Sequence, residues 1–277
     1  MKIAVTGSTG FIGSYLISFF EDAIPITRKD FQSDLLVKKI ASADAVINLA
    51  GMPIIRRWSE SYRYDLVTSR IETTRQVVKA VNETGTAHLI SVSAVGIYPD
   101  GKVCDEDCPE RARDFLGDLA AMWEEEASHC VNRLTITRLG VVLGKGGGAL
   151  SKMLVPFWLG IGGPIGNGRM IMSWIAMHDL ARLFRFILES ELTGIVNAVS
   201  PIPVTNREFT RALASVLNRP AFIPVPMFVL RLLYGDAASV LTASKEVYPK
   251  RALKAGFRFE YPEIRPALEN ILLKQKH

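Results

Sequence analysis

Short apolar runs alternate with longer amphipathic stretches over the first part of the chain, and this alternation sets the expected fold. The apolar runs predict buried strands at Ile3–Val5, Ile24–Thr27, Asp44–Gly51, His88–Ser93 and Leu134–Leu143. Between them, apolar residues at steps of three and four predict helices at Phe11–Phe20, near Ser33–Ser42, at Ser59–Val81 and at Phe115–His129. Because such strands are buried on both faces, we expect an α/β fold with a Rossmann-like doubly wound parallel sheet.

The regular alternation ends after Leu143. A loop read as flexible, "GKGGG", precedes an apolar segment rich in proline and glycine, and "MSWIAMHDL" then predicts a strand entering a helix. Thr205 and Glu208 have capping-box spacing, and Asp179 is expected to cap the helix that follows it. Helices dominate from Pro224 onward. We expect a larger domain over residues 1–145, with returning segments near 170–200. A smaller lobe with a helical C-terminal module is expected mainly over residues 146–277.

Three glycines, Gly7, Gly10 and Gly13, lie between the first predicted strand and the first predicted helix. In a dinucleotide-binding loop such glycines allow the tight turn, the approach of the pyrophosphate and the close packing of the helix, whose N-terminus attracts phosphate. A glycine-rich turn in another doubly wound fold is the alternative. The residues expected to bind the cofactor are Gly7, Thr9, Gly10, Phe11, Ile12, Gly13, Arg28, Leu49, Ala50, Gly51 and Ser91.

The end of the second predicted strand indicates which cofactor is bound. An acidic residue is expected there in an NAD-binding protein, but the sequence reads "ITRKD", with Arg28 and Lys29 at that place. A guanidinium can make bidentate contacts with a 2′-phosphate, so NADP(H) is favoured over NAD(H). Asp30 stands slightly late in the sequence, which leaves NAD(H) open.

Composition and charge narrow the class of protein. The chain has 277 residues, 48% of them hydrophobic, and a formal net charge of +5 spread along its length, which does not suggest a nucleic-acid partner. We find no segment typical of a membrane span or a signal peptide, and therefore expect a cytoplasmic protein without a membrane partner, or a mature chain that lacks its targeting segment. Three cysteines suggest reduced thiols without a metal site. The hydrophobic fraction leaves room for a homodimer.

Several motifs carry a family resemblance. "TGSTGFIG", "DAVINLAG" and "SVSAVGIY" resemble the extended short-chain dehydrogenase/reductase superfamily, which includes NAD(P)-dependent epimerases and dehydratases. "INLAGMPI", "RLGVVLGKGGGAL", "GGPIGNGR" and "VYPKRALKAGFRFEYPEIRPALENIL" are similar to its atypical epimerase-like group, often named after a sugar nucleotide epimerase or a cell-division inhibitor. The resemblance covers essentially the whole chain. It implies a Rossmann-like NADP-binding domain and a small substrate lobe.

The same resemblance exposes a departure from the family's catalytic pattern. In the superfamily a Tyr and a Lys four residues later act with a Ser, and the cationic Lys favours the tyrosinate form. Ser93 matches the Ser, but "DFLGDLAAMWEEEA" places Leu116 at the Tyr position and Ala120 at the Lys position. Candidate substitutes, each with a purely structural alternative, are Tyr98, Glu124 and Arg169. His178 and Asp179 adjoin, but no Ser nucleophile motif accompanies them.

Substrate-facing positions are expected beyond the strand ends. Trp174 and Trp58 offer flat surfaces, and Arg56 and Arg57 make an anionic substrate plausible, although two solvated arginines would look the same. The apolar segment around Phe157 and Trp158 reads equally as pocket lining or as core. The expected substrate residues are Arg57, Trp58, Glu124, Arg169 and Trp174.

Two functions remain open at this point. One is an NADP(H)-dependent oxidoreductase or epimerase-like enzyme that acts on a small polar molecule, with Ser93 and Tyr98 as the catalytic candidates. The other is a non-catalytic NADPH-binding redox sensor or regulator, which the loss of the Tyr and Lys pair favours. Fold-level similarity does not decide between them.

Overall fold

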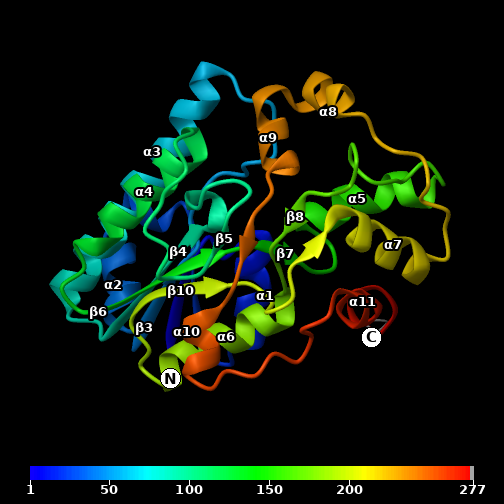
Figure 1. The fold of residues 1–277 in the computed structure, drawn as a ribbon. Coiled ribbons are helices and arrows are strands. Elements are labelled where there is room, and N and C mark those ends of the chain that lie inside the picture. Colours follow the sequence, from blue (N-terminus) through cyan, green and yellow to red (C-terminus); the bar gives the residue numbers. More distant parts are fainter. Residues whose placement is uncertain (275–277) are drawn as a thin grey trace.

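The fold is built around one parallel sheet. We describe it from a computed structural model, which describes residues 1–274. The six strands run in the order β10-β6-β4-β3-β1-β2, and every neighbouring pair is parallel (Figure 1). Their bounds are β1 Ile3–Thr6, β2 Ala23–Ile26, β3 Ala45–Asn48, β4 His88–Ala94, β6 Arg133–Leu139 and β10 Gly194–Ala198. The predicted Rossmann-like sheet is confirmed.

Helices cover both faces of the sheet. One face packs against α1 (Phe11–Phe19) and α6 (Met177–Glu189), through side chains such as Leu16 and Phe184. The other face packs against α2 (Leu35–Ala41) and α3 (Glu60–Thr84), and α4 (Phe115–Ser128) lies alongside α3. Because both faces are covered, the central strands β1, β3 and β4 are buried along nearly their whole length, whereas only Ile26 is buried in the edge strand β2.

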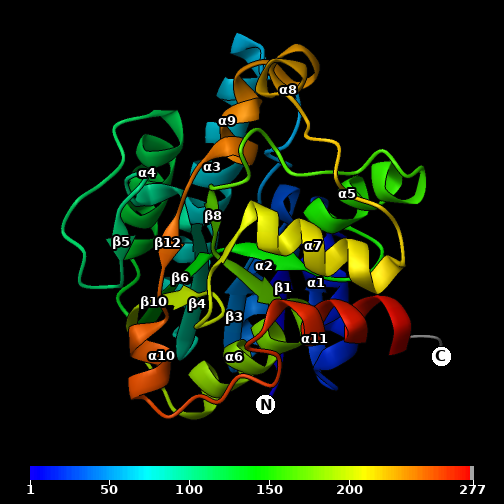
Figure 2. The same ribbon diagram turned by 45° about the vertical axis from the view of Figure 1, so that its right-hand side comes forward.

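A second lobe lies beside the carboxyl ends of the strands (Figures 1 and 2). α5 (Gly148–Trp158), α7 (Asn206–Leu217) and α11 (Ile264–Glu269) share one apolar core. The short pairs β7 (Val141–Leu143) with β9 (Trp174–Ala176), and β8 (Ile171–Met172) with β11 (Val204–Thr205), join this lobe to the sheet. The other elements are β5 Val103–Cys104, α8 Met227–Tyr234, α9 Ala238–Thr242, β12 Glu246–Val247 and α10 Lys250–Lys254.

Two predicted strands end earlier than their apolar runs. β3 stops at Asn48 because the next two backbone N–H groups donate to the Thr6 hydroxyl instead of extending the ladder. The run 134–143 splits into β6 and β7 at Gly140, where a Cβ atom would lie 2.6 Å from the carbonyl oxygen of Ser173.

The two predicted helix caps have different outcomes. The capping box of Thr205 and Glu208 is present at the start of α7. The prediction for Asp179 is wrong, because the N-cap of α6 is Ala176. The buried Asp179 carboxylate instead accepts hydrogen bonds from the backbone N–H groups of Glu260 and Tyr261, at 2.9 and 2.8 Å, and so anchors the C-terminal segment to α6.

Candidate nucleotide-binding and active site

The glycine loop forms a cradle that side chains would fill. Gly7 adopts a left-handed conformation, with φ of 62°, directly against the carbonyl group of Leu49. A Cβ atom on Gly13 would lie only 2.2 Å from the carbonyl oxygen of Gly7. Gly10 is the N-cap of α1 and makes no side-chain cap. The first-turn N–H groups are therefore left for an anion such as a pyrophosphate, which fits this loop.

A buried polar network fixes the opposite wall of the cradle. The Thr6 hydroxyl donates to Asn48 Oδ1 at 2.7 Å and accepts from the N–H groups of Leu49 and Ala50. Asn48 Nδ2 donates in turn to the hydroxyl of Thr74 on α3. These bonds hold the turn after β3 against Gly7. The segment through Gly51, which contains three of the residues expected to bind the cofactor, therefore borders the glycine loop.

The third wall is the end of β2. The Ser8 hydroxyl donates to the carbonyl oxygen of Ile26 at 2.9 Å and ties the glycine loop to this strand. Asp30 is buried, accepts from both the N–H and the hydroxyl of Thr27, and lies 2.9 Å from Lys39 Nζ. These bonds and Lys39 hold the pKa of Asp30 below its ordinary value, although its desolvation acts in the opposite direction. Its carboxylate is committed to its own turn, whereas Arg28 is exposed beside the loop.

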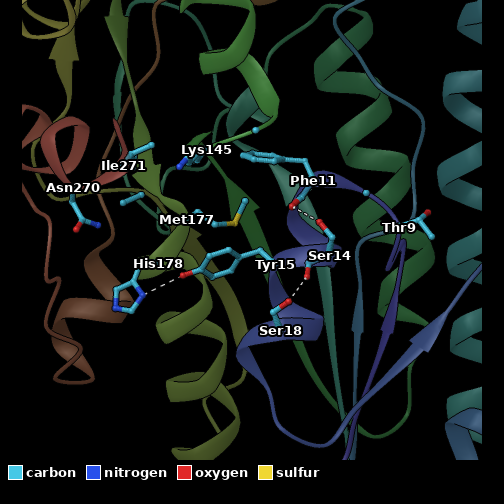
Figure 3. Close-up of a pocket in the computed structure, with 14 residues that line it drawn as sticks. Thr9, Phe11, Ser14, Tyr15, Ser18, Lys145, Met177, His178, Asn270 and Ile271 are labelled. Carbon is cyan, nitrogen blue, oxygen red and sulfur yellow. Dashed lines mark hydrogen bonds between the residues drawn. The ribbon is translucent and has the colours of Figure 1, made fainter. Parts of the chain in front are cut away.

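A cavity of about 530 Å³ adjoins the start of α1 (Figure 3). The Phe11 ring lies between α1 and the "GKGGG" loop, and Cβ atoms on Gly147 and Gly148 would come within 2.4 and 2.7 Å of that ring. Those glycines therefore make room for an aromatic ring. Across the cavity, His178 Nδ1 lies 3.3 Å from the Tyr15 hydroxyl, and its Nε2 lies 3.0 Å from Glu260.

Ser93 closes β4 within a buried charged cluster. Its hydroxyl donates to Glu124 Oε1 at 2.7 Å. Arg138 on β6 donates to both carboxylate oxygens of Glu124, from Nε at 2.8 Å and from Nη2 at 2.7 Å. All three side chains are at least nine-tenths buried. Although burial alone would lower it, the bonds and charge of Glu124 raise the pKa of Arg138 further above its already high value, so Arg138 stays charged.

Tyr98 belongs to the same cluster and is closed off from solvent. Its hydroxyl donates to Asn197 Oδ1 at 2.9 Å and accepts from Arg138 Nη1 at 2.8 Å, and only 1% of the residue is exposed. Burial raises the pKa of Tyr98 to about 12. These contacts favour the structural alternative for Tyr98 and speak against it as a proton donor.

The helix that carries Tyr and Lys in the superfamily presents apolar side chains here. Leu116 packs beside Gly96, just beyond the end of β4, with its Cβ 3.7 Å from the position of a Cβ on Gly96. Ala120 is buried in an apolar cluster with Ile97 and Tyr98. The space for a lysine side chain is therefore occupied, and α4 offers no proton relay at these two positions.

The expected substrate residues do not form one group. Trp174 was predicted to offer a flat surface, but it is fully buried and its Nε1 donates to the carbonyl oxygen of Ile202, so this prediction is wrong. Trp58 packs edge-on against Phe115. Arg57 and Arg169 are exposed, and Glu124 faces Arg138 rather than a substrate. Of the two ambiguous aromatic residues, Phe157 is core and Trp158 is 55% exposed.

Sequence reasoning missed the residues that complete the cluster. Arg138, Asn197 and Glu106 come from three separate segments, and Glu106 accepts the backbone N–H of Asn197 at 2.9 Å. One signal was available: an arginine within the otherwise apolar and uncharged run 134–143 requires a buried partner. Asn197 and Glu106 carry no comparable local signal, because their hydrogen-bond partners are distant in the sequence.

The fold and the glycine cradle define a Rossmann-type nucleotide-binding protein. A model of the NAD dependent epimerase/dehydratase family matches residues 3–198, and a domain of unknown function (DUF1731) matches residues 225–271. The chain belongs to the NAD dependent epimerase/dehydratase family. Epimerase family protein SDR39U1 of Mus musculus is 39% identical over 98% of this chain and 100% of its own length. Epimerase family protein YfhF of Bacillus subtilis (strain 168) is 32% identical over 100% and 99%.

Solved structures agree with this assignment. The crystal structure of human epimerase family protein SDR39U1 (isoform2) with NADPH has a TM-score of 0.88 and 34% identity, over 98% of this chain and 99% of that one. A dTDP-4-dehydrorhamnose reductase from Bacillus anthracis, at 18% identity, has a TM-score of 0.80 over 99% and 100%, and supports the fold alone. Within residues 1–274, no helix has the length and apolar character needed to cross a membrane, and no cluster of metal-ligating side chains is present.

Proposed function

We propose that this protein binds NADP(H) and is an oxidoreductase of the extended short-chain dehydrogenase/reductase type that acts on a small polar substrate. The arrangement at the end of β2 is the observation that carries the cofactor choice. Asp30 is held by Thr27 and Lys39, so no carboxylate is presented to a ribose hydroxyl, while Arg28 stays exposed. The human relative crystallised with NADPH supports the same choice.

The cofactor would lie across the carboxyl edge of the sheet. The first turn of α1 would hold the pyrophosphate, Arg28 the 2′-phosphate, and the turns after β3 and along β4 the remainder. The proposed contact residues are Gly7, Thr9, Gly10, Phe11, Ile12, Gly13, Arg28, Leu49, Ala50, Gly51 and Ser91. When bound, the reduced nicotinamide supplies a hydride. The chain itself supplies binding and orientation.

The proposal gives Ser93 a positioning role. The Ser93 hydroxyl donates its hydrogen bond to the Glu124 carboxylate, which Arg138 holds in place by an ion pair. The end of β4 would therefore be held rigidly beside the expected nicotinamide position. The apolar pair Leu116 and Ala120 leaves the proton to come from another group, such as water or a group on the substrate. Exposed Arg57 and Arg169 would favour a substrate with negative charge.

A second candidate is a non-catalytic NADPH-binding sensor. It is favoured by the same apolar pair, since Ala120 lies in a closed cluster with Ile97 and Tyr98. In that case the nucleotide cradle is retained and the chemistry is lost. A cytoplasmic location and a homodimer also stay predictions, and one relative, from Arabidopsis thaliana, is named as chloroplastic.

One set of assays separates these functions. NADPH oxidation would be followed with a panel of aldehydes, ketones and quinones, using the wild-type protein, Ser93→Ala and the control Ser128→Ala. Ser128 is exposed at the end of the same helix as Glu124. Turnover that falls in kcat only for Ser93→Ala, at unchanged NADPH affinity, supports the enzyme. Tight NADPH binding without turnover supports the sensor, and absence of NADPH binding overturns both.

A further inference from the structure

Exposed apolar side chains are concentrated on one part of the second lobe. Within residues 1–274, ten of the twenty large apolar residues that are exposed lie in two short stretches, 155–161 and 222–233. We call their surface the α5–α8 face; its residues are Val155, Trp158, Leu159, Ile161, Phe222, Ile223, Met227, Phe228, Leu232 and Leu233. Phe222 is 77% exposed and Leu232 is 72% exposed. Concentrations of this kind mark interaction surfaces.

The segment that follows α5 lies beside the coil that precedes α8. Val225 donates its N–H to the carbonyl oxygen of Pro164 at 2.8 Å, and Gly166 donates to that of Val225 at 2.9 Å. A Cβ atom on Gly163 would lie 1.7 Å from the carbonyl oxygen of Ile223, so the two backbones touch. In both views the coil before α8 runs along the outer edge of the molecule, from the lobe that contains α5 and α7 to α8, which lies next to α9 (Figures 1 and 2).

α8 is apolar on its exposed side as well as on its buried side. Its exposed side includes Met227, Phe228, Arg231 and Leu232, which lie within one helical stripe, whereas Leu230 faces the interior. A helix that only covers a core places polar residues on its outer side. Here the outer side is apolar with a basic residue, the pattern of a helix that rests in a lipid interface.

The two segments that carry this face have only basic charged residues. Residues 148–170 and 209–235 contain five basic residues and no acidic residue. The basic residues are Lys152, Arg169, Arg211, Arg219 and Arg231, and all of them are exposed. The acidic residues that border these segments are engaged elsewhere: Glu208 caps α7, and Asp236 pairs with Arg63 at 2.6 Å.

We propose that the α5–α8 face docks this protein on an anionic lipid surface. Phe222, Phe228 and Trp158 would enter the interfacial region, and the basic residues would face lipid phosphates. This occupant fits better than a second copy of the chain, because a symmetric pairing of the face would oppose arginines to arginines without an acidic partner. A peripheral face of this kind has no long apolar run, so the sequence pattern that predicts no membrane partner does not reveal it.

Vesicle co-sedimentation tests the proposal directly. The full chain would be mixed with vesicles of phosphatidylcholine alone, or with about 30% phosphatidylglycerol, at low and at near-physiological ionic strength. We expect binding to the anionic vesicles that weakens with salt, and little binding to the neutral ones. Replacement of Arg219 or Arg231 by Gln should weaken binding about fivefold each, since each basic residue near such a surface contributes about 1 kcal/mol.

Matched variants separate docking from general stickiness. Phe228→Ser/Leu232→Ser should abolish vesicle binding while NADPH affinity stays unchanged, which also shows that the variant is folded. Tyr64→Ser, at a residue 71% exposed on α3, is the control and should bind vesicles as the wild type does. Equal binding to neutral and anionic vesicles, no binding to either, or loss of binding in the Tyr64 variant alone would overturn the proposal. Concentration-dependent dimerisation that Phe228→Ser/Leu232→Ser removes would assign the face to a second copy instead.

Discussion

Replacing Glu124 by Gln tests whether the buried cluster at the end of β4 holds the fold together. The substitution keeps the size of the side chain and the acceptor for Ser93, but it removes the negative charge that faces Arg138. Arg138 is 6% exposed, and its guanidinium donates two bonds to this carboxylate, at 2.8 and 2.7 Å. Nothing else in its described surroundings supplies a carboxylate within ion-pair distance.

The expected cost follows from the stranded charge. Breaking a buried pair by removing one partner destabilises by about 3–5 kcal/mol, because the remaining ion stays desolvated. Against a total stability of about 5–15 kcal/mol this is a large share. At roughly 2–4 °C for each kcal/mol in a chain of this size, the Tm should fall by about 10 °C. Arg138→Met with Glu124→Leu together should cost clearly less than the two single substitutions added.

Urea unfolding followed by circular dichroism measures these free energies. The control is Glu191→Gln. Glu191 pairs at 2.6 Å with Arg133, which lies on β6 as Arg138 does, but both side chains of this pair are about half exposed. That variant should lose no more than about 1 kcal/mol. A loss below about 1 kcal/mol for Glu124→Gln, or additive costs in the double variant, would show that the Glu124–Arg138 pair does not stabilise the fold in this way.

Three further outcomes follow from other parts of the molecule. Gly13→Ala should reduce NADPH affinity and stability together, because its Cβ would lie 2.2 Å from a backbone oxygen; unchanged NADPH affinity in a calorimetric titration would contradict this. Thr205→Ala should cost about 1 kcal/mol in urea unfolding, whereas Thr205→Ser should cost little. Burial lowers the pKa of His88, so the unfolded state takes a proton that the folded state refuses, and stability should fall as the pH drops below about 6.5. His88→Gln should flatten that dependence between pH 7 and 5, and an unchanged slope would count against it.

The sheet and the glycine cradle were within reach of the sequence because their determinants are local. Apolar runs, glycine spacing and the arginine after the second strand each act within a few residues of where they stand. The splitting at Gly140 was not predictable in this way. It depends on the close approach of Ser173, which lies 33 residues further along the chain.

The interior of the site was harder to predict for the same physical reason. Nothing local to Tyr98 shows that Asn197 and Arg138 enclose its hydroxyl, and nothing local to Trp174 shows that Ile202 accepts its indole N–H. Exposure and burial of single aromatic residues are decided by contacts between distant segments. The absence of the Tyr and Lys pair was readable, but the filled space around Ala120 was not.

In the proposed function, Arg28 selects a phosphorylated dinucleotide at the end of β2. Calorimetric titration of the wild type, Arg28→Ala and the neighbouring control Lys29→Ala with NADPH and NADH tests it most directly. We expect Arg28→Ala to weaken the affinity for NADPH about 10–100-fold, which is the loss that follows from removing one charge-assisted hydrogen bond. The affinity for NADH should stay nearly unchanged. Equal losses for both coenzymes, or no heat with either of them, would contradict it.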